Sequence, residues 1–293
     1  MQDLYKKLKK QRNGLAKQGQ ENFYFFSNII MQSVFEKSML IERVHKAWCN
    51  KLQNLGEKGF KKKLLLLAQK ESLKTTITSI NFPLWKLIQP KGNLNKIFLG
   101  NAKLENSKGF LSAIRFHLEQ NKMFRNCYGD YTQGNKDWTK TAITVNRDQP
   151  LVEPTFGAVG QDSGLASQHP NIMIFDDWIN EKNTMTSGQL EKGIITFKQA
   201  IATAEKESII IVVGHIFHFK DLYAWLRSEY EDIGEWDIIF DPAIKDGKIL
   251  LPELYGENGE MLKKKKSELG EILYNAYFLL DPSGTKGRKL KYD

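Results

Sequence analysis

A lysine and a threonine stand side by side soon after a short, strongly apolar stretch. Lys74 and Thr75 follow the apolar residues 64–67 after a loop of six residues. A strand, a tight loop and a helix start in this order are typical of a phosphate site, because the exposed amides and the helix N-terminus face an anion. Ala68 and Leu73 occupy the two positions where such loops usually carry glycine. Taken alone, the segment fits a phosphate loop and equally a buried strand followed by a basic helix start.

Further polar groups follow two later apolar stretches. Asp176 and Asp177 come directly after residues 172–175, and Gly214 and His215 come after 208–213. In open α/β sheets ligands bind at the carboxyl ends of the strands, so these segments and the lysine loop are expected to converge there. Taken singly, the two aspartates are also typical of a turn or a helix cap after a strand.

Together these groups match the needs of phosphoryl transfer. A lysine covers the β- and γ-phosphates and a threonine hydroxyl ligates Mg²⁺, which fits Lys74 and Thr75. One carboxylate holds the water shell of the metal and its neighbour orients the attacking water, which fits Asp176 and Asp177. The joint pattern predicts a site for a phosphate-bearing substrate with Mg²⁺.

The apolar patterning predicts the elements that must position these groups. Short apolar strands are expected at 64–67, 96–100, 171–175 and 208–214. Helices are expected at about 74–88, 105–120, 187–204 and 221–230. Because strands this apolar are covered on both faces, we predict an α/β fold with a mainly parallel sheet flanked by helices.

The flanking segments carry weaker patterns. Residues 1–20 indicate a basic helix or arm, and the apolar spacing of 23–55 predicts two helices. Residues 126–160 are expected to be mostly extended. The lysine run 263–266 either follows DNA phosphates or forms a solvated helix face. Four residues are expected on the inward face of the two early helices: Phe35, Met39, Val44 and Trp48.

The composition excludes several classes of protein. The 293 residues are 41% hydrophobic and 26% charged, which is enough for a sizeable core and excludes a disordered chain. The 43 basic and 34 acidic residues give a net charge of +9, which permits binding to a phosphate-rich polymer. Cys49 and Cys127 match no metal-ligand spacing, and no apolar run approaches about 18 residues, so we expect a reducing, cytoplasmic setting and no membrane partner.

Taken in order, these segments resemble the ATPase domain of phage large terminases, the motors that package DNA. Residues 70–76 are similar to the variant phosphate loop of that family, with Lys70 in place of its arginine. Residues 172–183 resemble its acidic strand, which is the most specific block, and 211–218 resemble its coupling motif. The resemblance runs from about Phe23 to the C-terminus. It implies a P-loop NTPase fold of the ASCE type, with N-terminal helices and a small C-terminal subdomain.

The same resemblance implies three parts. Residues 1–60 would form an N-terminal helical arm and lid, and 61–240 the P-loop ATPase core. Residues 241–293 would form a C-terminal subdomain and a linker toward a nuclease domain, so nuclease activity is not expected from this chain. Ahead of the core, His45 or Trp48 would border the adenine.

The resemblance also assigns roles within the site. Thr75 and Asp176 would hold Mg²⁺. Asp177 would take the place of the catalytic glutamate of the family, and Lys70 would add positive charge. Either Asp177 positions the nucleophile, or Glu181 helps from the following turn. The residues expected to contact ATP are Gln69, Lys70, Glu71, Ser72, Leu73, Lys74, Thr75, Thr76, Gly214 and His215.

Two departures from the family pattern stand out. The coupling motif usually has threonine after its glycine, whereas this chain has His215, which either senses the γ-phosphate or packs. Residues 163–168 lack the arginine that many relatives carry there to complete the site of a neighbouring subunit.

The implied activity is ATP hydrolysis that drives double-stranded viral DNA into a capsid. The implied partners are double-stranded DNA, the portal protein of the procapsid, the small terminase subunit, and further copies of the chain in a homo-oligomeric ring, with a monomer in isolation. The location would be the host cytoplasm, with transient docking on the procapsid. Two alternatives remain: another P-loop DNA translocase or helicase, and a degenerate nucleotide- or DNA-binding module without turnover.

Overall fold

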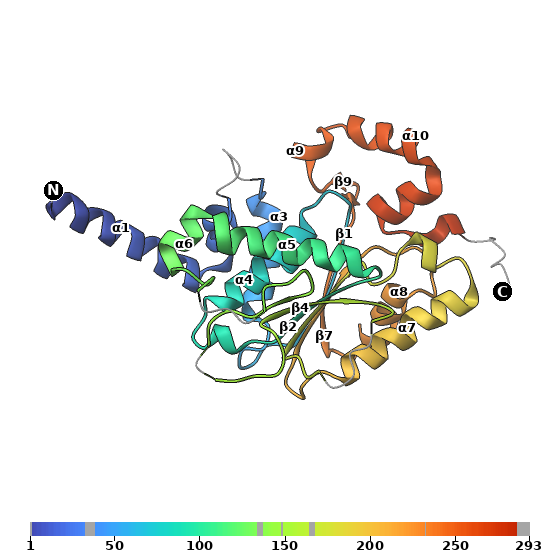
Figure 1. Ribbon diagram of the computed structural model, residues 1–293. Coiled ribbons are helices and arrows are strands. Elements are labelled where there is room, and N and C mark those ends of the chain that lie inside the picture. Colours follow the sequence, from blue (N-terminus) through green and yellow to red (C-terminus); the bar gives the residue numbers. More distant parts are fainter. Residues whose placement is uncertain are drawn as a thin grey trace.

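The computed structural model describes residues 2–32, 39–133, 137–147, 149–163, 168–231 and 233–285. Within these ranges, seven strands form one sheet (Figure 1), and their order across it is β3-β4-β2-β5-β6-β1-β7. All neighbouring strands are parallel except β3, which pairs antiparallel with β4 at the edge. The strands are β1 (Lys63–Ala68), β2 (Ile97–Asn101), β3 (Ala142–Ile143), β4 (Phe156–Gly160), β5 (Ile172–Asp176), β6 (Ile209–Gly214) and β7 (Trp236–Asp241).

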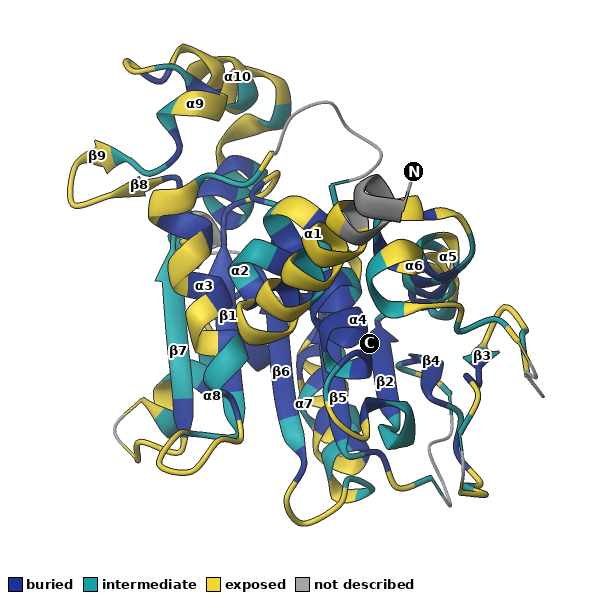
Figure 2. Ribbon diagram, turned by 90° about the vertical axis from the view of Figure 1, so that its left-hand side faces the viewer, coloured by how far each residue is buried: buried dark blue, intermediate teal, exposed yellow. Residues whose placement is uncertain are grey.

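Both faces of the sheet are covered, which is why its central strands read as unbroken apolar runs. Leu64 and Leu66 of β1 point into the core that contains α3 (Glu42–Asn54) and α5 (Leu104–Gln120). Leu65 and Leu67 point to the opposite face, which is covered by α7 (Ser187–Ala202) and α8 (Leu222–Tyr230). Figure 2 shows these strands buried between the helices. The predicted α/β fold with a mainly parallel, helix-flanked sheet is confirmed.

The position of β6 decides the geometry of the site. It lies between β1 and β5, with Leu67 opposite Gly214 and Val213 opposite Asp176. The loop after β1 and the carboxylates after β5 are therefore one strand apart, and the residue after Gly214 lies between them.

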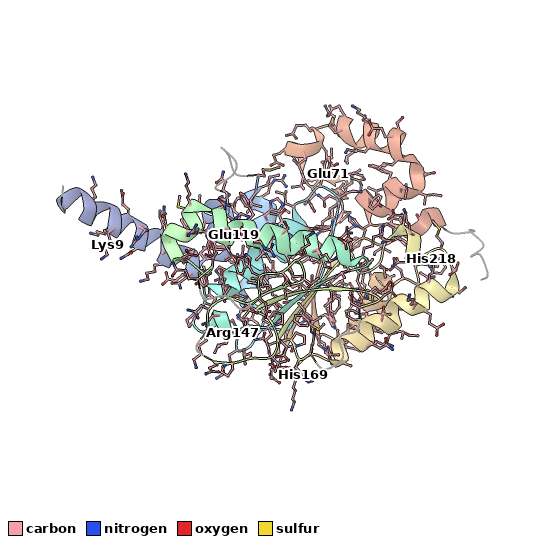
Figure 3. All side chains as sticks on the ribbon, in the orientation of Figure 1. Lys9, Glu71, Glu119, Arg147, His169 and His218 are labelled. Carbon is pink, nitrogen blue, oxygen red and sulfur yellow. The ribbon has the colours of Figure 1, made fainter. Side chains whose placement is uncertain are left out.

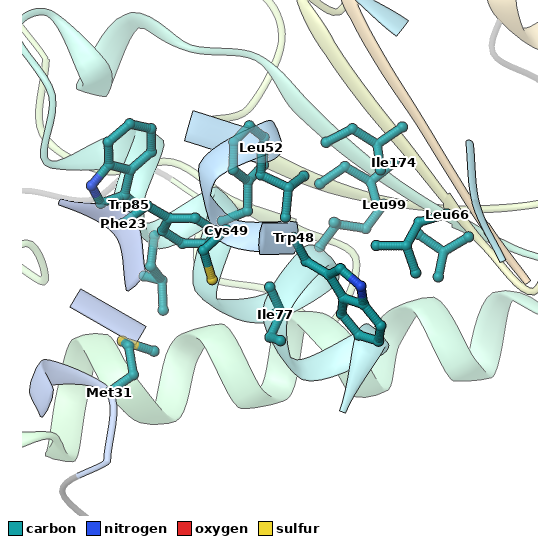
Figure 4. Packing of buried hydrophobic residues seen from close by; sticks show 14 of the residues in the cluster. Phe23, Met31, Trp48, Cys49, Leu52, Leu66, Ile77, Trp85, Leu99 and Ile174 are labelled. Carbon is teal, nitrogen blue, oxygen red and sulfur yellow. The ribbon is translucent and has the colours of Figure 1, made fainter. Parts of the chain in front are cut away.

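Helices precede the first strand, both in the basic segment 1–20 and in 23–55, where the sequence predicts them. They are α1 (Gln2–Glu21), α2 (Phe23–Phe25), the π-helix η1 (Phe26–Ile30) and α3. The outer end of α1 projects from the body of the molecule (Figure 1). Trp48, Cys49 and Leu52 of α3 pack against Ile77 and the strand residue Leu66 (Figure 4).

The predicted inward face of these helices is correct in part. Val44 and Trp48 are buried. Met39 is 54% exposed, so its placement in the core was wrong. It lies before α3 begins at Glu42, where helical spacing does not apply. Phe35 lies outside the described residues.

The stretch 126–160 is less extended than predicted. The helix α6 (Lys122–Tyr128) enters it, and only β3 and β4 are strands among the described residues there. Asn121 caps α6 by accepting a hydrogen bond from the amide of Phe124, whose buried ring anchors the helix. One capping residue and one apolar residue form too short a pattern to predict a helix beside the glycines and prolines that follow.

The C-terminal part stands beside the sheet and close to the loop after β1. It contains β8 (Ile244–Lys245), β9 (Lys248–Ile249), α9 (Pro252–Tyr255), α10 (Glu260–Tyr274), the π-helix η5 (Asn275–Leu279) and η6 (Pro282–Thr285). The remaining elements are η2 (Thr76–Asn81), α4 (Phe82–Leu87), η3 (Gly92–Leu94) and η4 (Glu181–Asn183). No helix of the described chain is long and apolar enough to span a membrane.

A histidine on α5 makes the stability of the fold pH-dependent. Burial lowers the pKa of His117 from 6.5 to about 4, and Asn121 Nδ2 donates to its Nδ1 at 2.9 Å. Between these pH values the imidazole of His117 is protonated in the unfolded chain but stays neutral in the folded protein. We therefore expect the free energy of unfolding to fall by up to about 3 kcal/mol as pH drops through this window.

Urea titrations at neutral pH and at about pH 4.5 measure this loss of stability. His117→Gln should flatten the pH dependence without abolishing it, because burial also lowers the pKa of His45, His215 and His218. An unchanged slope in His117→Gln would show that His117 does not carry this effect.

Candidate active site

The loop after β1 has the backbone of a glycine-containing turn without the glycines. Glu71 and Leu73 have φ of 66° and 61°, in the left-handed region that non-glycine residues rarely adopt. Within the turn, Ser72 Oγ donates to the carbonyl of Gln69 at 2.6 Å, and the helix starts at Lys74. Each such residue costs on the order of 1–3 kcal/mol and persists only where its surroundings impose it.

From the N-terminal side, α3 holds this loop. His45 Nδ1 accepts a hydrogen bond from the amide of Ile41 at 2.7 Å, so the ring proton is on Nε2, which donates to the carbonyl of Ser72 at 3.0 Å. Trp48 Nε1 donates to Asp241 Oδ2 at the end of β7. His45 and Trp48 are 0% and 1% exposed, so neither presents a face to an adenine.

From the other side, residues of the C-terminal part make hydrogen bonds to the outer turn of the loop after β1. The amide of Lys70 donates to the carbonyl of Tyr277 at 2.8 Å, and Tyr255 OH donates to the carbonyl of Lys70 at 2.7 Å. Lys265 of α10 pairs with Glu71, which lies on the side of these C-terminal helices (Figure 3). This pairing gives one member of the lysine run 263–266 a contact within the chain.

Lys74 points into the protein. It is 6% exposed, and its Nζ lies 2.9 Å from His215 Nε2 and 3.5 Å from the carbonyl of Gln69. Burial lowers the pKa of Lys74, whereas the charges of Asp177 and Asp176 act to raise it. The ammonium group therefore sits among acceptors on the inner side of the loop.

Asp176 is tied to the helix that follows the loop. Thr75 Oγ1 donates to its Oδ1 at 3.2 Å, and Ser79 Oγ donates to its Oδ2 at 2.6 Å. Asn101 Nδ2, at the end of β2, donates to its carbonyl at 2.6 Å. Burial raises the pKa of Asp176, and the charge of Asp177 acts in the same direction. The folded protein thus disfavours the ionised form of Asp176.

Asp177 follows β5 directly and has φ of 49°, in the left-handed region. Its Oδ1 is buried and lies 3.3 Å from His215 Nδ1, while 40% of the side chain is exposed. Burial acts to raise the pKa of Asp177, but His215, Lys74 and Lys70 outweigh it and hold the pKa below its ordinary value. The carboxylate is therefore ionised and faces partly outward.

Lys70 and Glu181, the two supporting residues predicted from the resemblance, both contact Tyr277. Lys70 Nζ lies 4.0 Å from the centroid of the Tyr277 ring, and Tyr277 OH donates to Glu181 Oε2 at 2.9 Å. The same ring packs edge-on against His215. Sequence reasoning missed Tyr277, and its surroundings contain no motif that indicates it.

The other predicted residues lie around this centre. Gln69 is fully buried, and both atoms of its side-chain amide lack a hydrogen-bond partner among the described residues. Thr76 is half-buried at the start of η2. Gly214 lies against the ring of Tyr223. Ser79 was also missed, although its place one helical turn after Thr75 puts it on the same face.

The segment after β6 is held by one buried carboxylate. Asp221, at the start of α8, accepts hydrogen bonds from the amides of Phe217 and His218 at Oδ2, and of Tyr223 and Ala224 at Oδ1. We expect Asp221→Ala to lower the free energy of unfolding by about 2 kcal/mol, because the four amides lose their acceptor.

Chemical denaturation measures this loss, and Asp221→Asn is the matched control. It keeps one acceptor oxygen and should lose about half as much. Equal stability of Asp221→Ala and the wild type would show that water replaces the carboxylate at no cost.

The donor set fits a nucleotide with Mg²⁺. Thr75 Oγ1 and Asp176 Oδ1 lie 3.2 Å apart and could both ligate a metal. No cluster of three or more His, Cys, Asp or Glu side chains suited to a metal occurs in the described residues. Mg²⁺ commonly takes one or two protein oxygens and completes its shell with phosphates and water. The side-chain amide of Gln69, which has no hydrogen-bond partner among the described residues, is a further polar group suited to a polar ligand.

Comparison with solved structures gives the same fold. The large terminase of bacteriophage HK97 matches with a TM-score of 0.63 and 13% identity, over 89% of this chain and 55% of that one. The large terminase of a thermophilic bacteriophage, solved in complex with ADP, matches with a TM-score of 0.45 and 12% identity, over 79% of this chain and 53% of that one. This chain thus spans about half the length of these structures. No protein-family model and no curated protein sequence matches it. The fold expected from the resemblance to phage large terminases is confirmed.

Proposed function

We propose that this chain hydrolyses ATP to drive double-stranded DNA into a viral capsid, as the ATPase domain of a large terminase. One observation carries the proposal: at the carboxyl edge of a parallel sheet, Thr75 contacts Asp176, and Lys74 and Asp177 lie on the two sides of His215. The similarity in fold to the HK97 large terminase supports the packaging role.

In this proposal the chain acts mainly by positioning and by charge. The loop amides and Lys74 bind the phosphates. Thr75 and Asp176 would hold Mg²⁺, which would neutralise charge on the phosphate oxygens. Asp177 would act beside them, and Lys70 and Glu181 would support the site through Tyr277.

The proposal extends to domains and partners. Residues 61–240 would form the ATPase core between an N-terminal helical part, 1–60, and a C-terminal subdomain, 241–293. Active chains would form a homo-oligomeric ring in the host cytoplasm. The ring would dock on the portal protein of the procapsid and act with the small terminase subunit on DNA.

The test compares ATP hydrolysis by the wild type and Lys74→Ala, with and without Mg²⁺ and double-stranded DNA. We expect Lys74→Ala to lose about 100-fold or more in rate, because it removes the buried cation beside the phosphates. Lys140→Ala removes an exposed lysine elsewhere and should leave the rate unchanged. If the wild type hydrolyses no faster than Lys74→Ala under every condition, including as an assembled ring, the motor function is excluded.

A nucleotide-binding module without turnover is the second candidate. The left-handed Glu71 and Leu73 favour it, because a Cβ at each position keeps phosphates farther from the backbone than glycine does. Such a module would bind ATP in a Lys74-dependent manner and release no phosphate. A helicase would instead separate strands in an unwinding assay.

A further inference from the structure

His215 is the one side chain within 4 Å of both Lys74 and Asp177 among the ion pairs and hydrogen bonds of the described residues. Its Nε2 lies 2.9 Å from Lys74 Nζ, and its Nδ1 lies 3.3 Å from Asp177 Oδ1. The ring is 3% exposed and packs edge-on against Tyr277, with ring centroids 5.2 Å apart. Packing and two polar neighbours thus fix where each ring nitrogen points.

These neighbours also select the tautomer. A carboxylate only accepts hydrogen bonds, so the proton belongs on Nδ1, facing Asp177. An ammonium group only donates, so Nε2 presents its lone pair to Lys74. Burial lowers the pKa of His215 to about 4, which keeps the ring neutral. The Nδ1 contact lacks regular hydrogen-bond geometry, and contacts of this kind commonly tighten only when substrate binds.

A bound nucleotide changes one of these contacts. In the proposed function Lys74 Nζ turns to the phosphates, and its hydrogen bond to Nε2 is then released. The lone pair of Nε2, which points toward Lys74, then has no other hydrogen-bond partner among the described residues and is directed at the phosphates that Lys74 would bind. Asp177 is one methylene shorter than a glutamate, and the imidazole extends its reach.

We propose that His215 Nε2 accepts a hydrogen bond from the water that attacks the γ-phosphate, and that Asp177 acts through His215 as a positioning residue. This inference rests on the proposed ATPase function. The water oxygen bonds to the γ-phosphorus while the bond from that phosphorus to the bridging oxygen breaks. The electron pair stays on ADP, and the protons of the water leave with inorganic phosphate and solvent.

A double-mutant cycle tests the pair in the full chain, with kcat, ATP affinity and melting temperature measured for each variant. His215→Ala should lose about 100-fold in kcat and little ATP affinity. Asp177→Ala should lose a similar factor. The double variant should lose no more than either single variant, because residues that act as a unit are not additive.

The sharper test is whether the effect of Asp177→Glu on kcat changes sign when His215 is replaced by alanine. Asp177→Glu alone should lower kcat at least about tenfold, because the longer chain crowds His215. In the His215→Ala background the same change should raise kcat at least about tenfold, because the glutamate reaches into the space left by the ring. A residue that only fills space would not reverse the sign of a neighbouring substitution.

Clear results would overturn the inference. These are a wild-type rate in His215→Ala, losses that multiply in the double variant, or an Asp177→Glu effect of the same sign in both backgrounds. If His215→Ala unfolds, His215→Leu keeps most of the volume beside Tyr277, lacks ring nitrogens and should show the same loss. The comparison of the wild type with Lys74→Ala distinguishes failure of the ATPase function from failure of the His215 inference alone. An active wild type with no loss in His215→Ala defeats only this inference, whereas an inactive wild type defeats the ATPase function and this inference with it.

Discussion

Gly214→Ala should lower the free energy of unfolding by about 2–3 kcal/mol, the range for overpacking a tight core. A Cβ at Gly214 would overlap Tyr223 Cζ and lie 2.5 Å from the hydroxyl oxygen of that ring. The ring cannot easily retreat, because it is 0% exposed and its hydroxyl lies near the backbone of Ile179. Either β6 or α8 must move, and β6 ends at Gly214, directly before His215. Urea denaturation of wild type and variant measures the loss.

A second glycine and a second-site change control this experiment. Gly109 on α5 has open space where its Cβ would be, so Gly109→Ala should stabilise the helix by up to about 1 kcal/mol. Replacing Tyr223 by Leu removes the clash, so Gly214→Ala should cost less in that background than alone. Equal effects of Gly214→Ala and Gly109→Ala would refute the steric explanation.

The strands and the convergence of the site residues could be predicted, because both follow from local patterns. Residues 64–67 are apolar at every position because both faces of the strand are covered. Such a run can be recognised from a few consecutive residues. Thr75 and Asp176 are in contact because both lie at the carboxyl ends of parallel strands, so their separation in the sequence does not matter.

Contacts made by distant segments could not be predicted in this way. Strand order depends on which apolar faces pack best, so nothing in residues 209–214 indicates that β6 lies between β1 and β5. Tyr277 contacts Lys70, although it lies about two hundred residues later in the chain. The left-handed φ of Leu73 also went unpredicted, because leucine rarely adopts it and only the hydrogen bonds on both sides of the loop impose it.

Asp176→Asn should make the metal-free protein more stable and abolish Mg²⁺-dependent hydrolysis. Burial raises the pKa of Asp176 in the folded protein, so at neutral pH the folded state disfavours the charge that the unfolded chain carries freely. Removing the charge should add on the order of 1 kcal/mol of stability. In the proposed function the same change weakens the Mg²⁺ site that Asp176 would share with Thr75, and we expect the rate to fall about 1,000-fold.

A substitution that raises the free energy of unfolding and lowers the rate of hydrolysis indicates a residue that is retained for its ligand and not for the fold. Ser79→Ala is the matched control, because it removes the 2.6 Å hydrogen bond to Asp176 Oδ2 and a 3.3 Å contact with Thr78 Oγ1 but leaves the carboxylate in place. It should lose about 1 kcal/mol of stability and keep most of the rate. Thermal denaturation without metal and hydrolysis over a Mg²⁺ titration measure both quantities. If Asp176→Asn were less stable than the wild type yet equally active, Asp176 would be a structural cap for the helix that starts at Lys74, and the metal role assigned to it would fail.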